Sequence, residues 1–314
     1  MFSKAIWEGW FLPGQQMKNI SLLSFLLYGL TVSAETLQDS MQKTQDVFLN
    51  FLEYPVAVVF FIFFYALILW GITLLLSFLF SRMFAQTSFV PAFWKPWDIL
   101  VFVFFYFACF VLLSSLIQSL ASLSKEQEYF SHLAIYWVVN IFCLFALFFF
   151  LSFLPGYDKK SLGLCSIRRK EALGVVLGYI SFLPWYLFLF YCTHLLFALF
   201  HLKPQVQEVA LKILSSQGFI WWFAVATAIL VAPLIEEFLF RVFLYGVLRE
   251  YFGKVWAVIF TSILFSLMHQ NLFAFLPILG LGIFLQILYE KKQCLWYCIL
   301  AHSLHNILTL LYLL

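Results

Sequence analysis

Residues 219–248 read FIWWFAVATAILVAPLIEEFLFRVFLYGVL, an apolar run that contains only three charged side chains, Glu236, Glu237 and Arg241. Placing one such charge at the centre of a bilayer costs about 2.5–3.5 kcal/mol on insertion scales. Three charges in one apolar segment therefore indicate a functional group of residues inside a bundle of membrane helices. The run is longer than the about 20 residues that a span needs. It also holds Pro233 near its middle, which predicts a tilt, a kink or a helix in two pieces.

The composition of the whole chain agrees with a membrane setting. Hydrophobic residues make up 64% of the 314 positions and charged residues 11%, whereas a soluble domain carries about 25% charged residues. A net charge of +3 is too small to indicate nucleic acid as a partner. The six cysteines are scattered, nearly all in apolar runs, and have no zinc-ligand spacing. We interpret them as small apolar side chains that face lipid or the helix core.

Apolar runs separated by charges predict an all-α, polytopic bundle of about eight transmembrane helices. Three spans are expected in an N-terminal membrane region, residues 35–171, and five in a core formed by residues 172–314. Gly280 and Gly282 predict a close approach between two of the core helices. The predicted spans are Pro55–Phe80, Ile99–Leu123, Tyr129–Leu154, Leu173–Phe200, Phe219–Leu248, Val255–His269, Phe273–Tyr289 and Cys294–Leu314.

Residues 1–34 have the organisation of a secretory signal peptide. From Met17 the chain shows a basic start, the apolar stretch Ile20–Val32 and a small-residue cleavage site that ends at Ala34. We therefore expect that translation starts at Met17 and that the mature chain begins at Glu35. The alternative is a short anchor that is retained together with a cytoplasmic tail.

The basic residues of the predicted loops indicate the orientation of the chain, because cytoplasmic loops carry an excess of Lys and Arg. The loop 155–172 is predicted in the cytoplasm and the segment after Glu35 outside, as a cleaved signal peptide would leave it. We expect an integral protein of the plasma membrane, which in a bacterium is the inner membrane. One set of alternate loops holds Arg82, Lys95, Lys159, Lys160, Arg168, Arg169, Lys170, Arg249, Lys254, Lys291 and Lys292, and the other set holds only Lys125, Lys203 and Lys212.

The spacing of the three charges separates their roles. Glu237 and Arg241 are four residues apart, so they share a helix face and can form an ion pair that makes their burial tolerable. Glu236 lies about 100° around the helix and has no partner on this segment. A salt bridge that only locks helices together would explain Glu237 and Arg241 but not Glu236. An unpaired carboxylate in a dry site is a competent general base near neutral pH.

Two later spans bring further polar groups. One ends with Phe265-Ser-Leu-Met-His269, and the other contains His302-Ser-Leu-His305-Asn306. His302 and Asn306 are four residues apart and face the same way, with His305 close to that face. A bundle interior that holds Glu, His, His and Asn contains a base, a second group to hold a water molecule, and donors for a developing oxyanion.

The motifs Glu236-Glu237-x-x-x-Arg241, Phe265-x-x-x-His269 and His302-x-x-x-Asn306, in this order on successive helices, resemble those of the CAAX protease and bacteriocin-processing (CPBP, Abi) intramembrane protease family, which includes the type II CAAX prenyl endopeptidase. All three motifs match without a departure, and His305 is additional. The resemblance extends over about residues 172–314. It implies an endopeptidase that cleaves a membrane-associated peptide or protein by glutamate-activated water.

The resemblance also implies a role for each residue. Glu236 would be the general base, His269 would help to position the water, and His302 with Asn306 would form the oxyanion site. Glu237 and Arg241 would support them, as would the motif residue Phe265. The family has also been viewed as metal-dependent, and Glu236, His269 and His302 are the residues that would hold zinc. We expect the metal-free mechanism, without a cofactor.

Two other classes of protein stay open at this point. A non-catalytic membrane binder, for instance an immunity or scaffold protein, would hold a peptide or lipid in the same polar cavity. A proton-coupled transporter would use Glu236 and the histidines as a proton path, although the sequence shows no inverted repeat. Membrane lipid is an expected partner in every case, and a membrane-associated peptide or protein substrate in the case of the protease.

Overall fold

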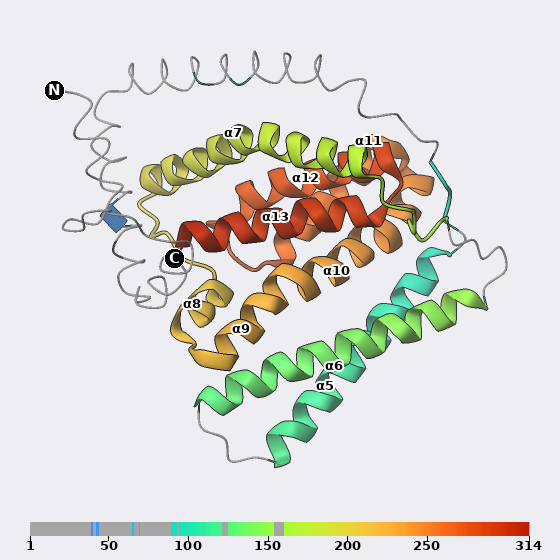
Figure 1. The fold of residues 1–314 in the computed structure, drawn as a ribbon, viewed down its shortest axis with the longest axis horizontal. Helices are drawn as coiled ribbons and strands as arrows, with labels where there is room; N and C mark the ends of the chain where they lie inside the picture. Colours follow the sequence, from blue (N-terminus) through green and yellow to red (C-terminus); the bar gives the residue numbers. More distant parts are fainter. Residues whose placement is uncertain are drawn as a thin grey trace.

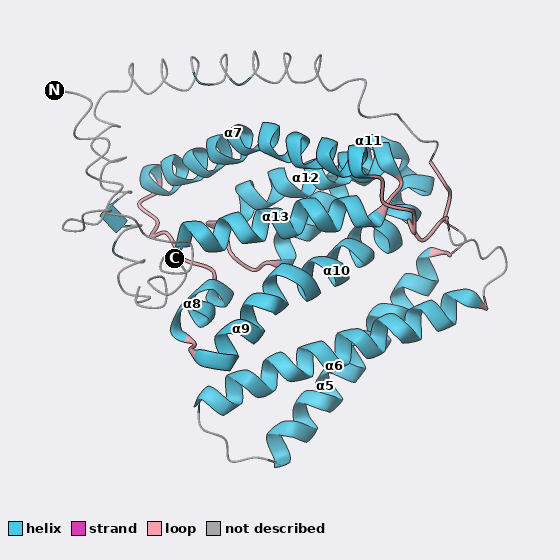
Figure 2. Cartoon of the chain, viewed as in Figure 1, coloured by secondary structure: helices cyan, strands magenta, loops and turns pink. Residues whose placement is uncertain are grey.

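The fold is all-helical in a computed structural model that describes residues 89–92, 94–120, 125–153 and 160–313, together with the single residues 39, 42, 43, 65 and 69. Helices and connecting loops account for these ranges, and Figure 2 shows no strand among them. The predicted all-α class is therefore confirmed. The candidate signal peptide and the predicted span Pro55–Phe80 lie outside the described residues.

The described helices follow the predicted spans closely. An additional short helix, α8, was not predicted, because eight residues in a polar connection carry too few periodic positions to stand out. The elements are α5 (Pro96–Leu120), α6 (Lys125–Ser152), α7 (Arg169–Leu199), α8 (Glu208–Ser215), α9 (Gly218–Ala226), the π-helical turn η2 (Thr227–Val231), α10 (Ala232–Glu237), the π-helical turn η3 (Phe238–Leu244), α11 (Tyr245–Met268), α12 (Phe275–Lys292) and α13 (Leu295–Leu313).

Three stretches of the described chain are long and apolar enough to cross a membrane, namely Tyr129–Ser152, Arg169–Leu199 and Gly218–Met268. The last is 51 residues long and is interrupted at Gly253, whose φ of 74° and ψ of 172° are not helical. This break lies between the predicted spans Phe219–Leu248 and Val255–His269, as expected. The count of about eight spans stays a prediction.

Large apolar side chains cover the outside of the bundle. Phe104 on α5 and Phe145 and Phe149 on α6 are 77%, 72% and 68% exposed. Exposed aromatic surface on this scale is unusual for a soluble monomer. It is the expected composition of a surface that faces lipid tails.

The C-terminal helices form the layer that holds the polar residues. In Figure 1, α7, α12 and α13 lie side by side, and α10 runs next to α13. The antiparallel helices α11 and α12 approach closely at Gly282, where an added Cβ would lie 3.3 Å from the Cα of Ser262. Gly280 similarly faces the side chain of Leu189 on α7. Both glycines therefore have the packing role that small residues usually have between membrane helices.

Charged side chains gather at one end of this layer. The Glu290 carboxylate on α12 pairs with Arg249 at 3.2 Å and with Lys254 at 3.5 Å. Lys292 pairs with Glu171 of α7 at 3.7 Å. All three basic residues come from loops that were predicted on the cytoplasmic side, so the fold brings them to a common end, as the predicted orientation requires.

The cysteines are not all apolar filling, contrary to the sequence-based interpretation. Cys165 and Cys294 form a disulfide, with their Cα atoms 5.5 Å apart. They are 129 positions apart in the chain and meet because the loop before α7 packs on the turn between α12 and α13. The backbone N–H of Leu295 donates to the carbonyl of Gly163 there at 2.9 Å. This contact between distant loops could not be read from the spacing of the cysteines.

Candidate active site

Both glutamates lie on α10, a six-residue α-helix between the π-helical turns η2 and η3. Pro233 stands in the first turn of α10. Its ring would clash with a carbonyl of the preceding α-helical turn, and the wider π turn relieves that clash. The interruption predicted from Pro233 is therefore the π turn η2 in a continuous helix, and a second π turn, η3, follows the glutamates. Such turns are frequent at functional sites.

Glu237 and Arg241 form the predicted ion pair, and both side chains are fully buried. The Arg241 Nε–H donates to Glu237 Oε2 at 2.9 Å, and Nη2–H donates to Oε1 at 3.5 Å. His302 on α13 reaches the same carboxylate, with Nδ1 2.8 Å from Oε1. The buried Glu237 carboxylate thus joins η3 to α13.

Phe265 lies between these charged groups. The guanidinium carbon of Arg241 is 4.6 Å from the centre of the Phe265 ring, a cation–π distance. The rings of His269 and His302 meet the Phe265 ring edge to face, at centroid distances of 4.9 and 5.8 Å. One apolar side chain therefore fixes the spacing of both histidines and covers Arg241.

Glu236, about 100° around α10 from Glu237, also faces the two histidines. Its Oε2 atom lies 4.0 Å from His269 Nε2 and 3.9 Å from His302 Nε2. Within the described part of the chain, Oε2 is a buried atom that has no hydrogen-bond partner. The gaps are too long for direct hydrogen bonds. A water molecule that hydrogen-bonds to the carboxylate and both imidazoles would bridge gaps of this length.

The hydrogen bonds of the two histidines fix their neutral tautomers. The Glu237 carboxylate and the Phe265 carbonyl only accept, so the His302 Nδ1–H donates to Glu237 and the His269 Nδ1–H donates to Phe265 at 2.8 Å. In each neutral ring Nε2 then carries the lone pair. Both lone pairs are directed to the same small space as Glu236 Oε2.

Asn306 lies one turn beyond His302 and is held by the first π turn. Its Nδ2 donates to the carbonyl of Ala228 in η2 at 2.8 Å. One amide proton is used in this bond, and the other is available for a second acceptor. His305 points elsewhere, because its Nδ1 lies 2.9 Å from the Tyr179 hydroxyl on α7. The structure thus separates the motif residue Asn306 from the additional residue His305.

The N-terminal helices form the other wall of the site. The Trp137 Nε1–H of α6 donates to the Thr227 hydroxyl in η2 at 2.8 Å. The Glu236 carboxylate lies within electrostatic reach of the hydroxyls of Tyr106 on α5 and Tyr136 on α6. Sequence reasoning missed this wall. The one signal in the sequence is that Thr227 is a polar residue within an apolar run, and no pattern identifies Trp137 as its partner.

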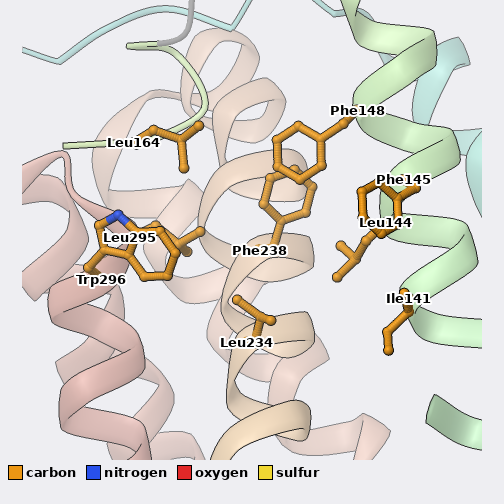
Figure 3. Close-up of a pocket in the computed structure, with 9 residues that line it drawn as sticks. All are labelled: Ile141, Leu144, Phe145, Phe148, Leu164, Leu234, Phe238, Leu295 and Trp296. Atoms are coloured by element: carbon orange, nitrogen blue, oxygen red, sulfur yellow. The ribbon is translucent and has the colours of Figure 1, made fainter.

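An apolar cavity of about 250 Å³ lies on the opposite side of α10. Figure 3 shows Leu234 and Phe238 pointing into it, opposite the side chains of α6. Leu234 is two residues before Glu236, which is about 200° around the helix. The cavity and the space beside Glu236 are therefore separated by α10 itself. The lining consists of Ile141, Leu144, Phe145, Phe148, Leu164, Leu234, Phe238, Leu295 and Trp296.

The carboxylate and imidazole atoms at Glu236, His269 and His302 are of the types that bind zinc, but the distances between them are longer than in a zinc site. Among the described residues, no group of three or more His, Cys, Asp or Glu side chains is placed to hold a metal ion. Glu236, His269 and His302 come together with gaps of 4.0 and 3.9 Å. Two ligand atoms of a tetrahedral zinc ion would be about 3.3 Å apart. Each gap would have to close by about 0.6–0.7 Å to reach that spacing.

Comparisons with known proteins converge on the segment that carries these residues. Residues 217–308 match the family described as type II CAAX prenyl endopeptidase Rce1-like. A protein of Bacillus subtilis (strain 168) named "Putative membrane peptidase YdiL" is 30% identical over 77 residues, which cover 24% of this chain and 32% of that relative. No solved structure matches the chain. The predicted family resemblance is confirmed, and with the apolar helices it identifies a membrane protein.

Proposed function

We propose that this chain, whose residues 217–308 match the type II CAAX prenyl endopeptidase family, is an endopeptidase that acts inside the plasma membrane on a membrane-associated peptide or protein. The observation that carries the proposal is the position of Glu236. Its Oε2 atom has no hydrogen-bond partner among the described side chains. It faces two imidazole Nε2 atoms at 3.9 and 4.0 Å. A salt bridge that only joins helices would not need this arrangement.

In the proposed mechanism a water molecule occupies the space between Glu236, His269 and His302. Glu236 takes a proton from this water as the water oxygen attacks the carbonyl carbon of the scissile peptide bond. The carbonyl oxygen becomes an oxyanion in a tetrahedral intermediate. When the intermediate collapses, the carbon–nitrogen bond breaks and the proton passes from Glu236 to the leaving nitrogen. The products are a carboxylic acid and an amine.

The buried Glu237 carboxylate supports the proposed oxyanion role of His302. The proposed oxyanion role requires a proton on His302 Nε2, and Glu237, which accepts from Nδ1 at 2.8 Å, would stabilise such an imidazolium as a carboxylate does in a serine protease triad. His302 Nε2–H can then donate to the oxyanion. The free amide proton of Asn306 is the second proposed donor.

The proposal is tested with a peptide library. Purified protein in detergent is incubated with membrane-anchored peptides that carry or lack a lipidated cysteine, and products are identified by mass spectrometry. Cleavage at defined bonds by the wild type supports the endopeptidase and identifies its substrate class. If wild type and Glu236→Gln give equal background while both are folded, the polar cluster serves binding or transport instead.

We expect hydrolysis to survive metal removal. The same purified protein is dialysed against a chelator, its zinc content is measured, and its rate is compared with that of a known zinc peptidase treated in parallel. An unchanged rate at negligible zinc supports glutamate-activated water. If the rate falls and zinc restores it, Glu236, His269 and His302 hold the ion, and zinc lowers the pKa of the attacking water.

A further inference from the structure

We propose that a second, buried polar site lies one helical turn from the proposed catalytic groups, between η3, α11 and α12, and that it binds ordered water which holds Arg241 in place. Its residues are Arg241, Ser262 and Gln286, and all three are fully buried. The water-binding part of this inference is independent of the proposed peptidase function. The expected effect on hydrolysis rests on that function.

Each residue of the site lies about one helical turn from a residue in or next to the proposed catalytic group. Arg241 is four residues after Glu237, and Ser262 is three residues before Phe265. Gln286 is four residues after Gly282, which packs against Phe265. In all three helices this displacement is toward the end of the bundle where Glu290 forms its ion pairs. Gly282 lies opposite Ser262, so the Cα of Gln286 is about one turn beyond Ser262, and its side chain, which leaves the helix toward the N-terminus, leans back toward Ser262.

Contacts between the helices surround the three residues of this site. The Arg241 guanidinium lies against the Phe265 ring at 4.6 Å. A Cβ at Gly282 would lie 3.3 Å from both the Phe265 ring and the Ser262 side chain. The Cys298 thiol of α13 donates to the carbonyl of Leu285, next to Gln286, at 3.6 Å. These contacts link η3 to α11, α11 to α12 and α12 to α13.

Four polar atoms of these residues have no hydrogen-bond partner within the described chain: Arg241 Nη1, Ser262 Oγ, and both Nε2 and Oε1 of Gln286. Each buried polar group that stays unpaired destabilises a fold by about 1–3 kcal/mol. Native interiors resolve such clusters with ordered water, which makes two to four hydrogen bonds. Gln286 is fully buried, and neither of its amide atoms is bonded to another described residue, which is an especially clear indication.

The charges and donors of the site favour water over an ion. Glu237 already neutralises Arg241 at 2.9 Å, so the site has no net charge to attract an anion or cation. Arg241 Nη1 and Gln286 Nε2 donate, Gln286 Oε1 accepts, and the Ser262 hydroxyl does either. A water molecule can satisfy both kinds of group. Arg241 is then bonded to Glu237 on one side and to water on the other.

This arrangement makes Gln286 a positioning residue. It acts through water on Arg241, then through Glu237 on Nδ1 of His302. A side-chain movement of about 1 Å in such a support can cost up to about 100-fold in rate. We therefore expect Gln286 to affect the rate of hydrolysis without contacting the substrate.

The decisive experiment measures the thermal stability of Gln286→Leu in detergent. If water fills the site, leucine at position 286 removes the hydrogen bonds between the side chain and the water. Arg241 Nη1 then loses its bridging partner, so Tm falls. If the site is dry, leucine removes two unpaired polar atoms and Tm rises or stays the same, which overturns the proposal. Ser262→Ala, a smaller change in the same site, is expected to lower Tm in the same direction. The lipid-facing variant Ile287→Leu is the matched control.

Activity and density provide two further readouts. For a cleaved peptide, Gln286→Leu is expected to lower kcat by about 10-fold to 100-fold with KM unchanged. Gln286→Asn, which keeps both amide atoms, is expected to restore most of kcat. A structure that resolves ordered water is expected to show density between Arg241 and Gln286, and a direct bond between these two side chains would contradict the proposal. If water and the loss of Tm are found without any peptidase activity, the proposed function fails and the hydration site stands.

Discussion

Glu236→Gln abolishes peptide hydrolysis and leaves the helix bundle folded. Removal of a general base reduces the rate by about 10²–10⁴-fold, and glutamine cannot take a proton from water. The bundle tolerates the change because Glu236 Oε2 has no hydrogen-bond partner among the described residues and lies 3.9 Å or more from both imidazoles. Initial rates on a cleaved peptide, together with thermal unfolding of the same samples, check both parts.

Glu250→Gln is the matched control for this variant. Glu250 is an exposed carboxylate on α11, so its amide removes the same charge without touching the site. Full activity in Glu250→Gln and none in Glu236→Gln assigns the loss to position 236. A Glu236→Gln protein that hydrolyses the peptide at the wild-type rate would show that another group activates the water.

The largest effect on stability is expected for Arg241→Met. Removal of one partner of a buried ion pair destabilises by about 3–5 kcal/mol, because the remaining charge stays buried without compensation. Arg241 and Glu237 are both fully buried, so among the described residues Glu237 would keep only His302 as a polar partner, at 2.8 Å. We expect a large decrease in Tm and a loss of hydrolysis, since Glu237, which orients His302, is no longer held by Arg241. Thermal or denaturant unfolding in detergent measures the first effect.

Two further variants separate pairing from general fragility. Glu237→Leu combined with Arg241→Met removes both charges and is expected to be more stable than Arg241→Met alone. Arg249→Met breaks the ion pair with Glu290, where the Arg249 side chain is 25% exposed, and is expected to cost about 1 kcal/mol or less. A double variant that is less stable than Arg241→Met would show that packing, not charge pairing, dominates at this position.

The parts of the fold that could be predicted from the sequence are those that depend on the residues of a single segment. Apolar runs and charges located the described helices α5 to α7 and α9 to α13 and the break beside Gly253. The four-residue spacing predicted the pair of Glu237 with Arg241. The first π turn, by contrast, leaves the Ala228 carbonyl to a partner outside its own helix, and this partner is Asn306, 78 residues later in the chain. Such a contact has no local signature.

The candidate site shows the same division. The three motifs predicted which polar residues converge, and the structure brings Glu236, Glu237, His269 and His302 together. The sequence did not indicate that Phe265 is the common packing surface, because any large apolar residue fits a membrane helix pattern. It also placed His305 near the site, whereas α7 provides the Tyr179 hydroxyl that holds it at 2.9 Å.

The two π turns around α10 constrain how this helix can change in length during evolution. A π turn holds about one residue more than an α turn, so loss of one residue from η3 would rotate all later residues by about 100° relative to Glu237. Arg241 would then leave the face that contacts Glu237 and Phe265. Homologous chains are therefore expected to vary in length in the connection before α8, and to conserve residue number between Thr227 and Leu244 even where the amino acids differ.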